Sequence, residues 1–254
     1  MTEIHLVPCL KDNYAYILHE PRTRATAVVD PSEAAPVIEA LRARGLALTH
    51  ILNTHHHFDH TGGNVELKEL TGARIIGPRA DADRIPGIDI QVGQGDLVAI
   101  GTAIARVYDI PAHTRGHIAF WFEEAKAVFT GDTMFAMGCG RLFEGTPEQM
   151  WQSLSTLARL PADTRVYCGH EYTQSNGRFA LSLEPGNADL IARMLEVDDL
   201  RQRGLPTIPS TIGLELRTNP FMRPDSSELR RTLNMEGASL VEVFAETRRR
   251  KDVF

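Results

Sequence analysis

The 254-residue sequence predicts an α+β fold in which a strand-rich region precedes a smaller helical region. Two observations support this prediction. Short apolar runs rich in β-branched and aromatic residues recur through the first 170 residues, with turn formers between them. Beyond residue 173, apolar residues recur every three to four positions, which is the period of a helix. We therefore predict a mixed domain over residues 1–173 and a helical domain over residues 174–254.

The strand-rich region contains nine runs with the composition of β-strands. Early runs alternate apolar residues with others, as at Ile4 and Leu6, which predicts a sheet with two distinct faces. The runs lie at 4–7, 14–18, 25–29, 50–52, 74–76, 103–110, 118–122, 127–129 and 165–167.

Two helices are predicted among these strands. The first spans 34–44, with Val37 and Leu41 on one face, and Gly45 is suited to the residue after its end. The second begins after Thr146, which can cap it together with Gln149, while Pro147 suits the first helical position. This second helix must end before Pro161.

The helical region is predicted to contain two helices joined by an irregular segment. Asn187 can cap a helix that stops near Gly204. Residues 205–224 are rich in proline and turn formers, so we predict an irregular surface linker there. A last helix is predicted from about residue 238, with Leu240, Val241 and Phe244 on its apolar side.

The bulk composition excludes several classes of protein. A net charge of −6 argues against general nucleic-acid binding. No apolar run approaches the roughly 20 residues that span a bilayer, and the N-terminus lacks the features of a signal peptide. Three cysteines give no disulfide framework. We expect a cytoplasmic monomer with no membrane or nucleic-acid partner.

Residues 54–60, Thr-His-His-His-Phe-Asp-His, are the most informative stretch of the chain. His55, His57, Asp59 and His60 are all good metal ligands. A mixed nitrogen and oxygen set suits zinc, iron or manganese and favours a catalytic site over a structural one. One tetrahedral ion cannot easily take four ligands from one short turn. The cluster therefore predicts two adjacent ions, each completed from elsewhere.

Three later segments supply candidates for the remaining ligands. His113, Asp132 and His170 each lie in a turn-rich loop just after a predicted strand. Loops held by a rigid sheet are where catalytic groups concentrate. Glycine next to two of these residues, as in Gly131-Asp132 and Gly169-His170, allows the backbone to approach an ion closely.

The pattern Thr-His-x-His-x-Asp-His with distant His, Asp and His resembles the metallo-β-lactamase superfamily. Within it, residues 130–141 (Thr-Gly-Asp-Thr-Met-Phe-Ala-Met-Gly-Cys-Gly-Arg) and 167–173 (Tyr-Cys-Gly-His-Glu-Tyr-Thr) look like the glyoxalase II (hydroxyacylglutathione hydrolase) family. The resemblance implies a four-layer αβ/βα sandwich followed by a helical, substrate-binding domain. It also implies hydrolysis of S-(R)-lactoylglutathione to glutathione and D-lactate in methylglyoxal detoxification.

The resemblance also implies the roles of individual residues. His55, His57 and His113 would hold one ion, Asp59, His60 and His170 a second, and Asp132 would bridge the two. The ions would be zinc, with iron or manganese as alternatives, and the nucleophile a bridging hydroxide flanked by Asp59 and Asp132. Glutathione would be bound by Arg141, Phe143, Tyr172, Arg248 and Lys251. Phe143 departs from the family, where tyrosine is common, so one hydroxyl contact is missing.

The other histidines and cysteines have simpler interpretations. His56 alternates away from its neighbours and is expected to point elsewhere, and His117 is expected to orient a ligand or to make a structural hydrogen bond. Cys139 and Cys168 are expected to be small buried side chains.

Three alternatives to the thioester hydrolase stay open. A mononuclear iron glutathione-persulfide dioxygenase of the same superfamily would share the first motif, but such proteins tend to lack the helical tail. A lactonase or broad esterase would have no need of the cations in the tail. A non-catalytic protein with a structural metal is disfavoured because the predicted ligands contain no cysteine.

Overall fold

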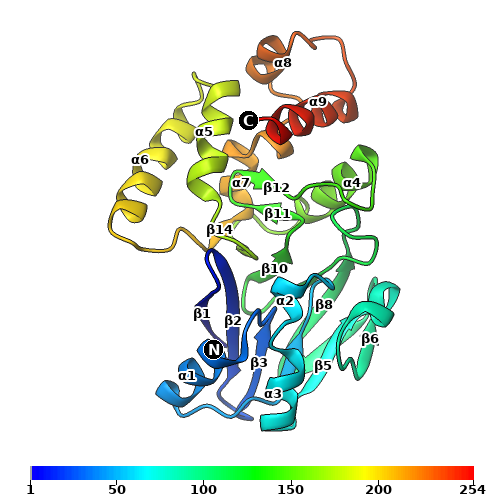
Figure 1. Cartoon of the computed structure of the whole chain (residues 1–254). Helices are drawn as coiled ribbons and strands as arrows, with labels where there is room; N and C mark the ends of the chain where they lie inside the picture. The colour runs from blue at the N-terminus through cyan, green and yellow to red at the C-terminus, as the bar shows by residue number, and fades with distance from the viewer. Residues whose placement is uncertain (1) are drawn as a thin grey trace. The chain divides into compact units, whose positions relative to one another are not determined.

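The computed structural model describes residues 2–254 and divides into two compact units. The first contains the chain up to residue 109 and residues 114–131, and the second contains residues 110–113 and 132–254. The fold class is α+β, as predicted, and Figure 1 shows the course of the chain. The predicted domain boundary near residue 173 stays a prediction.

Two sheets form the first unit. One has the strand order β1-β2-β3-β4-β5-β6, antiparallel from β1 to β3 and parallel from β3 to β6. These strands are β1 (Glu3–Cys9), β2 (Asn13–Glu20), β3 (Ala25–Val29), β4 (His50–Leu52), β5 (Arg74–Pro78) and β6 (Ile90–Val92). The other is an antiparallel meander of β7 (Leu97–Ile100), β8 (Ala103–Asp109), β9 (Ile118–Phe122) and β10 (Ala127–Gly131). The short strands β6 and β7 were not predicted.

Alternation along β2 assigns one face of the first sheet to helices and the other to the second sheet. Ala15 and Ile17 share a core with Val37 of α1 (Ala34–Arg44) and Leu67 of α3 (Asn64–Thr71). Between them, Tyr16 points the other way, and its ring lies 5.6 Å from that of Phe129 in β10. The first unit thus has a helix–sheet–sheet order, in agreement with the predicted sandwich.

The second unit is mainly helical. Its long helices are α4 (Pro147–Leu157), α5 (Thr173–Leu183), α6 (Ala188–Gln202) and α9 (Leu240–Asp252). Its short helices are α7 (Ile212–Thr218), the 3-10 helix η2 (Pro220–Met222) and α8 (Ser227–Leu233). Two hairpin strands, β11 (Met134–Phe135) and β12 (Gly138–Cys139), and the pair β13 (Arg165–Cys168) and β14 (Ser210–Thr211) complete it. Helices α5 and α6 lie side by side.

The predicted helix ends are confirmed where local chemistry determines them. Gly45 adopts a left-handed conformation after α1, and its N–H bonds to carbonyls of the last turn. Thr146 and Gln149 form a reciprocal capping box at the start of α4, with Pro147 at the first position. Asn187 accepts a hydrogen bond from the Leu190 N–H and caps α6.

Two predictions about the second unit are wrong. Residues 205–224 are not an irregular surface linker: they contain β14, α7 and η2, and Ile212, Glu215 and Phe221 are fully buried. Their burial depends on partners far away in the sequence, which local composition does not reveal. In α9, Leu240 is exposed and the apolar side is formed by Val243 and Phe244. The helix begins after the capping box at Ser239, and tertiary packing, rather than local composition, determines which of its faces is buried.

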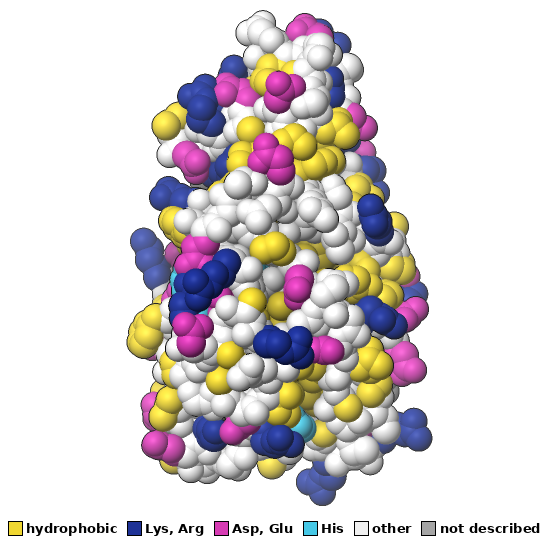
Figure 2. Space-filling model, turned by 90° about the vertical axis from the view of Figure 1, so that its right-hand side faces the viewer, with side chains coloured by type: hydrophobic (Ala, Val, Ile, Leu, Met, Phe, Trp, Pro, Cys, Tyr) yellow, Lys and Arg dark blue, Asp and Glu magenta, His cyan; other side chains and the backbone are white. Residues whose placement is uncertain are grey.

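The surface carries both signs of charge. On the face shown in Figure 2, lysine and arginine side chains are interspersed with aspartate and glutamate, and the described residues there form no continuous basic patch. Over residues 2–254, none of the helices combines the length and apolar character needed to cross a bilayer.

Candidate metal centre

The histidine motif lies directly after β4, where the chain leaves the parallel part of the first sheet. His55 is fully buried, and its ring centroid lies 4.8 Å from that of His57 and 4.1 Å from that of His60. The short helix α2 (Phe58–Thr61) begins after His57 and carries Asp59 and His60 in its single turn. A strand end followed by one helical turn therefore gathers the four predicted ligands of the first unit.

Asp30, a buried residue just after β3, determines how two of these histidines present their nitrogens. The Thr54 hydroxyl donates to Asp30 Oδ2 at 2.6 Å, so its oxygen is left to accept from His55 Nδ1 at 3.0 Å. His60 Nδ1 lies 3.1 Å from the same Oδ2 and must donate, because a carboxylate only accepts. Both rings therefore carry their proton on Nδ1, and Nε2 keeps the lone pair that binds a metal.

The ligand atoms of Asp30, His55 and His60 lie within 4.8 Å of one another, although Asp30 was not predicted. We assign it an orienting role, because its Oδ1 also accepts the Thr54 backbone N–H at 2.8 Å. The signal was present in the sequence: like the predicted ligands, Asp30 comes directly after a strand.

Asp59 is a partly exposed ligand candidate of the first unit. Its side chain is 38% exposed, and Oδ2 lies 3.6 Å from His60 Nε2. Asn13 donates to this oxygen at 3.0 Å and to the Asp59 backbone carbonyl at the same distance. Asn13 therefore ties the start of β2 to α2. The sequence alone did not indicate this contact.

The second unit contains the other three predicted ligands, with His113 and His170 both close to Asp132. His113 Nε2 lies 3.5 Å and His170 Nε2 3.3 Å from Asp132 Oδ2. His113 Nδ1 lies 2.9 Å from the carbonyl oxygen of Arg141, which can only accept, so Nε2 again keeps its lone pair. The His170 ring is stacked on Tyr172 with centroids 4.7 Å apart.

These separations fit metal coordination. Two ligands bound to one ion at about 2.1 Å in tetrahedral geometry lie about 3.4 Å apart. The Nε2–carboxylate separations in both units are close to this value. Imidazole and carboxylate donors with metal-ready tautomers are therefore present in each unit, as a binding site for divalent ions requires.

Two further histidines lie next to the ligands. His56 Nδ1 is 3.3 Å from the buried Asp81, which also accepts from Arg84 and from the Gly116 N–H. The ring of His117 is stacked on that of His55, with centroids 4.5 Å apart. His56 thus faces a different carboxylate from Asp30, whereas the orienting or hydrogen-bonding role expected of His117 stays a prediction.

The two cysteines near the predicted site are buried, as expected. Burial raises the pKa of the Cys139 thiol to about 11 and that of Cys168 to about 12. Both thiols are therefore protonated at neutral pH, which makes them poor nucleophiles and poor metal ligands.

All five predicted substrate-binding residues belong to the second unit, but they differ in exposure. The Arg141 side chain is 67% exposed, and Phe143 is exposed with its ring 5.2 Å from that of His113. Tyr172 is exposed, and its ring is stacked on that of His170. Lys251 lies over the Phe179 ring, and burial, together with the nearby Arg248, lowers its pKa.

Arg248 is the exception, because its side chain is only 8% exposed. Its Nη1 donates to the Cys139 carbonyl at 2.8 Å, and its Nη2 donates to Asp252 at 2.9 Å. The guanidinium also lies over the Phe221 ring, 5.1 Å from its centroid. In this structure Arg248 joins α9 to β12.

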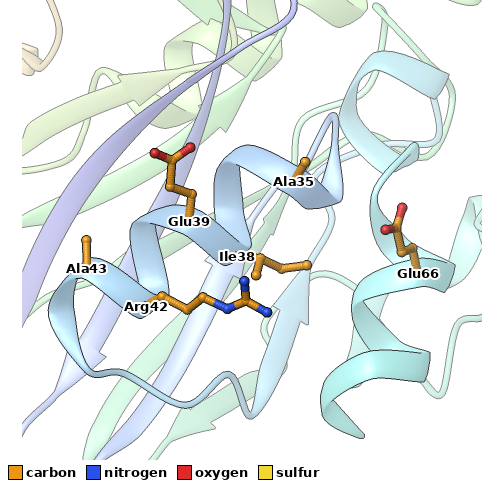
Figure 3. A pocket seen from close by; sticks show the side chains of 6 residues that line it. All are labelled: Ala35, Ile38, Glu39, Arg42, Ala43 and Glu66. Atoms are coloured by element: carbon orange, nitrogen blue, oxygen red, sulfur yellow. The ribbon is translucent and has the colours of Figure 1, made fainter.

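A concave pocket of about 590 Å³ lies between α1 and α3 of the first unit (Figure 3). Its lining contains neither histidine nor cysteine, so it lacks the chemistry of the ligand sets. The lining residues are Ala35, Ile38, Glu39, Arg42, Ala43 and Glu66.

Comparisons with solved structures show the fold. The structure of ETHE1 from Myxococcus xanthus is similar, with a TM-score of 0.70 and 25% identity over 98% of this chain and 90% of the other. The structure of TTHA1623 in a di-iron-bound form has a TM-score of 0.62 and 25% identity, covering 85% of this chain and 98% of the other.

Comparisons of sequence show the family. The family model for the Metallo-beta-lactamase superfamily matches residues 12–170, and that for the Hydroxyacylglutathione hydrolase C-terminus matches residues 171–254. A hydroxyacylglutathione hydrolase of Methylococcus capsulatus is 58% identical, over 100% of this chain and 99% of the relative. One of Rhodospirillum rubrum is 56% identical, over 99% and 98%. The chain therefore belongs to the hydroxyacylglutathione hydrolase (glyoxalase II) family of the metallo-beta-lactamase superfamily.

Proposed function

We propose that the protein hydrolyses S-(R)-lactoylglutathione, and related S-2-hydroxyacylglutathiones, to glutathione and the free 2-hydroxy acid, which for lactoylglutathione is D-lactate. Full-length relatives named hydroxyacylglutathione hydrolase support this activity. The match of residues 171–254 to the C-terminal family model favours it over the persulfide dioxygenase, which tends to lack the helical tail. In this proposal residues 1–173 carry the chemistry and residues 174–254 bind substrate.

The observation that carries the proposal is that Arg141 contacts a predicted metal ligand through its backbone while its side chain is exposed. Its carbonyl oxygen fixes the ring of His113, while its exposed guanidinium is free of the protein interior. The Arg141 guanidinium therefore belongs to the same residue whose backbone carbonyl contacts His113. Such a site suits a substrate that carries an anionic group in the same molecule as the carbonyl that is attacked, as a glutathione thioester does.

The two ligand sets fit a pair of divalent ions, by their donors and tautomers. We assign His55, His57 and His113 to one ion and Asp59, His60 and His170 to the other, with Asp132 as the bridge. Two such ions would lower the pKa of a bound water to about 7, which would make it a nucleophile at neutral pH, and would polarise the thioester carbonyl. Zinc is our first assignment, with iron or manganese as alternatives, because all three accept these donors.

The residues of the chain then hold and orient the reactants. Asp30 and Thr54 fix the rings of His55 and His60, and the Arg141 carbonyl fixes that of His113. A thiol with a pKa of about 8.5 leaves as thiolate without a strong general acid, which an amide nitrogen would need. The site therefore has to position the thioester rather than donate a proton to it.

The glutathione part would be bound by cations and rings of the second unit. Arg141 and Lys251 offer positive charge, and Tyr172 offers a hydroxyl beside His170. Phe143 replaces a common family tyrosine and offers only an apolar surface next to His113. The three buried free thiols suit a reducing compartment, so we place the enzyme in the cytoplasm. We further propose that it acts as a monomer.

The test is hydrolysis of S-(R)-lactoylglutathione by purified protein, followed by loss of thioester absorbance with and without a chelator. We expect rapid hydrolysis that the chelator abolishes and added metal restores. The control substrate is a lactoyl thioester of an uncharged thiol, which should react with a much higher KM. Metal-loaded protein that hydrolyses neither thioester would contradict the proposal.

A further inference from the structure

Asp252 places an internal carboxylate among the cations of the predicted substrate site. It is the last residue of α9, and its Oδ1 lies 2.9 Å from Arg248 Nη2 and 4.0 Å from Arg141 Nε. Its own side chain is 45% exposed. One carboxylate oxygen therefore lies between a buried guanidinium and an exposed one.

Helix stability does not explain this aspartate. The C-terminus of a helix carries partial negative charge, so a carboxylate in the last turn is unfavourable. An arginine four residues before an acid is also the less favourable order for a helical ion pair. Glu246 of the same helix shows the favourable order, since it precedes its partners Arg249 and Arg250. Residues that break local rules in this way are concentrated at functional sites.

Asp252 also limits access to Arg248. One terminal nitrogen of that guanidinium donates to the Cys139 carbonyl and the other to Asp252, and one face of the guanidinium lies over the Phe221 ring. Of these three groups, only the Asp252 carboxylate is itself half-exposed. A carboxylate that approaches Nη2 of Arg248 from solvent therefore competes with Asp252 for that nitrogen.

We infer that Asp252 is a specificity-determining residue, an internal carboxylate that competes with the carboxylate of the ligand for Arg248 and Arg141. It weakens the binding of anionic ligands and so helps release the glutathione product. The identity of the ligand rests on the proposed function, whereas the competition itself follows from the contacts of Asp252.

The test is calorimetric binding of glutathione to metal-loaded wild-type protein and to Asp252→Asn, which keeps the shape of the side chain and removes its charge. We expect about fivefold tighter binding to the variant, the equivalent of one exposed ion pair. Glutathione with its glycine carboxyl converted to an amide should bind the two proteins equally. Glu246→Gln removes the same charge from another face of α9 and should leave both affinities unchanged.

Weaker binding by Asp252→Asn would overturn the inference and make Asp252 a positioning residue for Arg248. Equal affinities would overturn it as well, as would a failure of both proteins to bind glutathione. The outcome is separable from that of the proposed function, which is decided by thioester turnover of the wild-type protein. Normal turnover with equal affinities would refute only the role of Asp252.

Discussion

The two units each bury a carboxylate in a network of hydrogen bonds, but only one of these networks holds residues that a sequence motif identified as ligand candidates. In the first unit, Asp30 orients His55, through Thr54, and His60. In the second, Glu215 is fully buried beside Arg193, with Nη2 to Oε1 at 2.6 Å. The first network serves ligands that lie within residues 54–60, and the second joins segments that are far apart in the chain.

Glu215 holds the hairpin that follows Asp132. Its Oε1 also accepts from the Ser210 hydroxyl, and its Oε2 accepts from the Met137 N–H at 2.8 Å. Asn219, bonded to the same Oε2, donates to the carbonyls of Phe135 and Gly138. The β11–β12 hairpin is therefore held by α7 and the residue that follows it, within the segment that was predicted to be a surface linker.

The difference teaches that a motif reveals ligand candidates that are near one another in sequence, but not the buried carboxylates that hold them. Asp30 lies 24 residues from Thr54, and Glu215 lies 22 residues from Arg193 and 78 from Met137, so no local pattern connects either carboxylate to its partners. Such a network is expected to contribute to stability and to the position of the hairpin, whereas the Asp30 network is expected to contribute to metal affinity. The predictions below test that separation.

The largest effect is expected from Glu215→Gln. Removing one partner of a buried ion pair leaves an unpaired charge on Arg193, so the free energy of unfolding should fall by about 3–5 kcal/mol. Chemical denaturation would measure this loss. Asp199→Asn breaks an exposed pair with Arg203 and should cost no more than about 0.5 kcal/mol. A comparable cost for both substitutions would mean that the buried network adds little.

Most of the fold could be predicted, and ligand candidates could be named, because local chemistry determines helix ends and places polar residues after strands. Thr146, Gly45 and Asn187 mark helix ends through bonds to neighbouring backbone groups. The ligand candidates follow strand ends. What could not be predicted depends on tertiary packing: the burial of Glu215, and the apolar side of α9, where Phe244 packs on Trp151 and Phe221.

The resemblance also identified Arg248 without revealing its environment. The resemblance implied that Arg248 and Lys251 act together as substrate cations. The structure buries the guanidinium of Arg248 against Cys139 and Phe221, with Asp252 beside it. A motif can thus predict which residue matters, whereas the exposure of its side chain requires the packed structure.

Asp132→Asn should have the next largest effect, on metal binding rather than on stability. Groups that merely orient metal ligands contribute about 10–100-fold to affinity or activity, so losing a bridging ligand should lower turnover by more than about 100-fold. Elemental analysis should show loss of bound metal together with activity. With chelator present, unfolding of the variant and of wild type should differ by less than about 1 kcal/mol. Two retained ions with normal turnover would refute the bridging assignment.

Asp30→Asn should reduce metal affinity by about 10–100-fold. The amide has one acceptor oxygen instead of two, so it cannot accept from the Thr54 N–H as well as from the Thr54 hydroxyl and His60 Nδ1. Competition with a chromogenic chelator would measure this affinity. Asp81→Asn is the matched control, since Asp81 is equally buried but faces His56. If both variants lost metal to the same extent, the effect would reflect general disturbance of the unit and not the orientation of two ligands.

The smallest effect is expected at Glu246, a partly exposed counterpart of the fully buried Glu215. Hydrogen bonds from Arg249 and Arg250 lower the pKa of Glu246 from 4.5 to about 2. Because the folded-state pKa is depressed, its contribution to stability is complete above about pH 4.5 and is lost as the pH falls through about 2. Solvent screening should keep this contribution below about 0.5 kcal/mol at pH 7. Denaturation of Glu246→Gln and wild type across this range should show a small difference that vanishes near pH 2. A difference of several kcal/mol at pH 7 would contradict the distinction between buried and exposed carboxylates on which this comparison of the two networks rests.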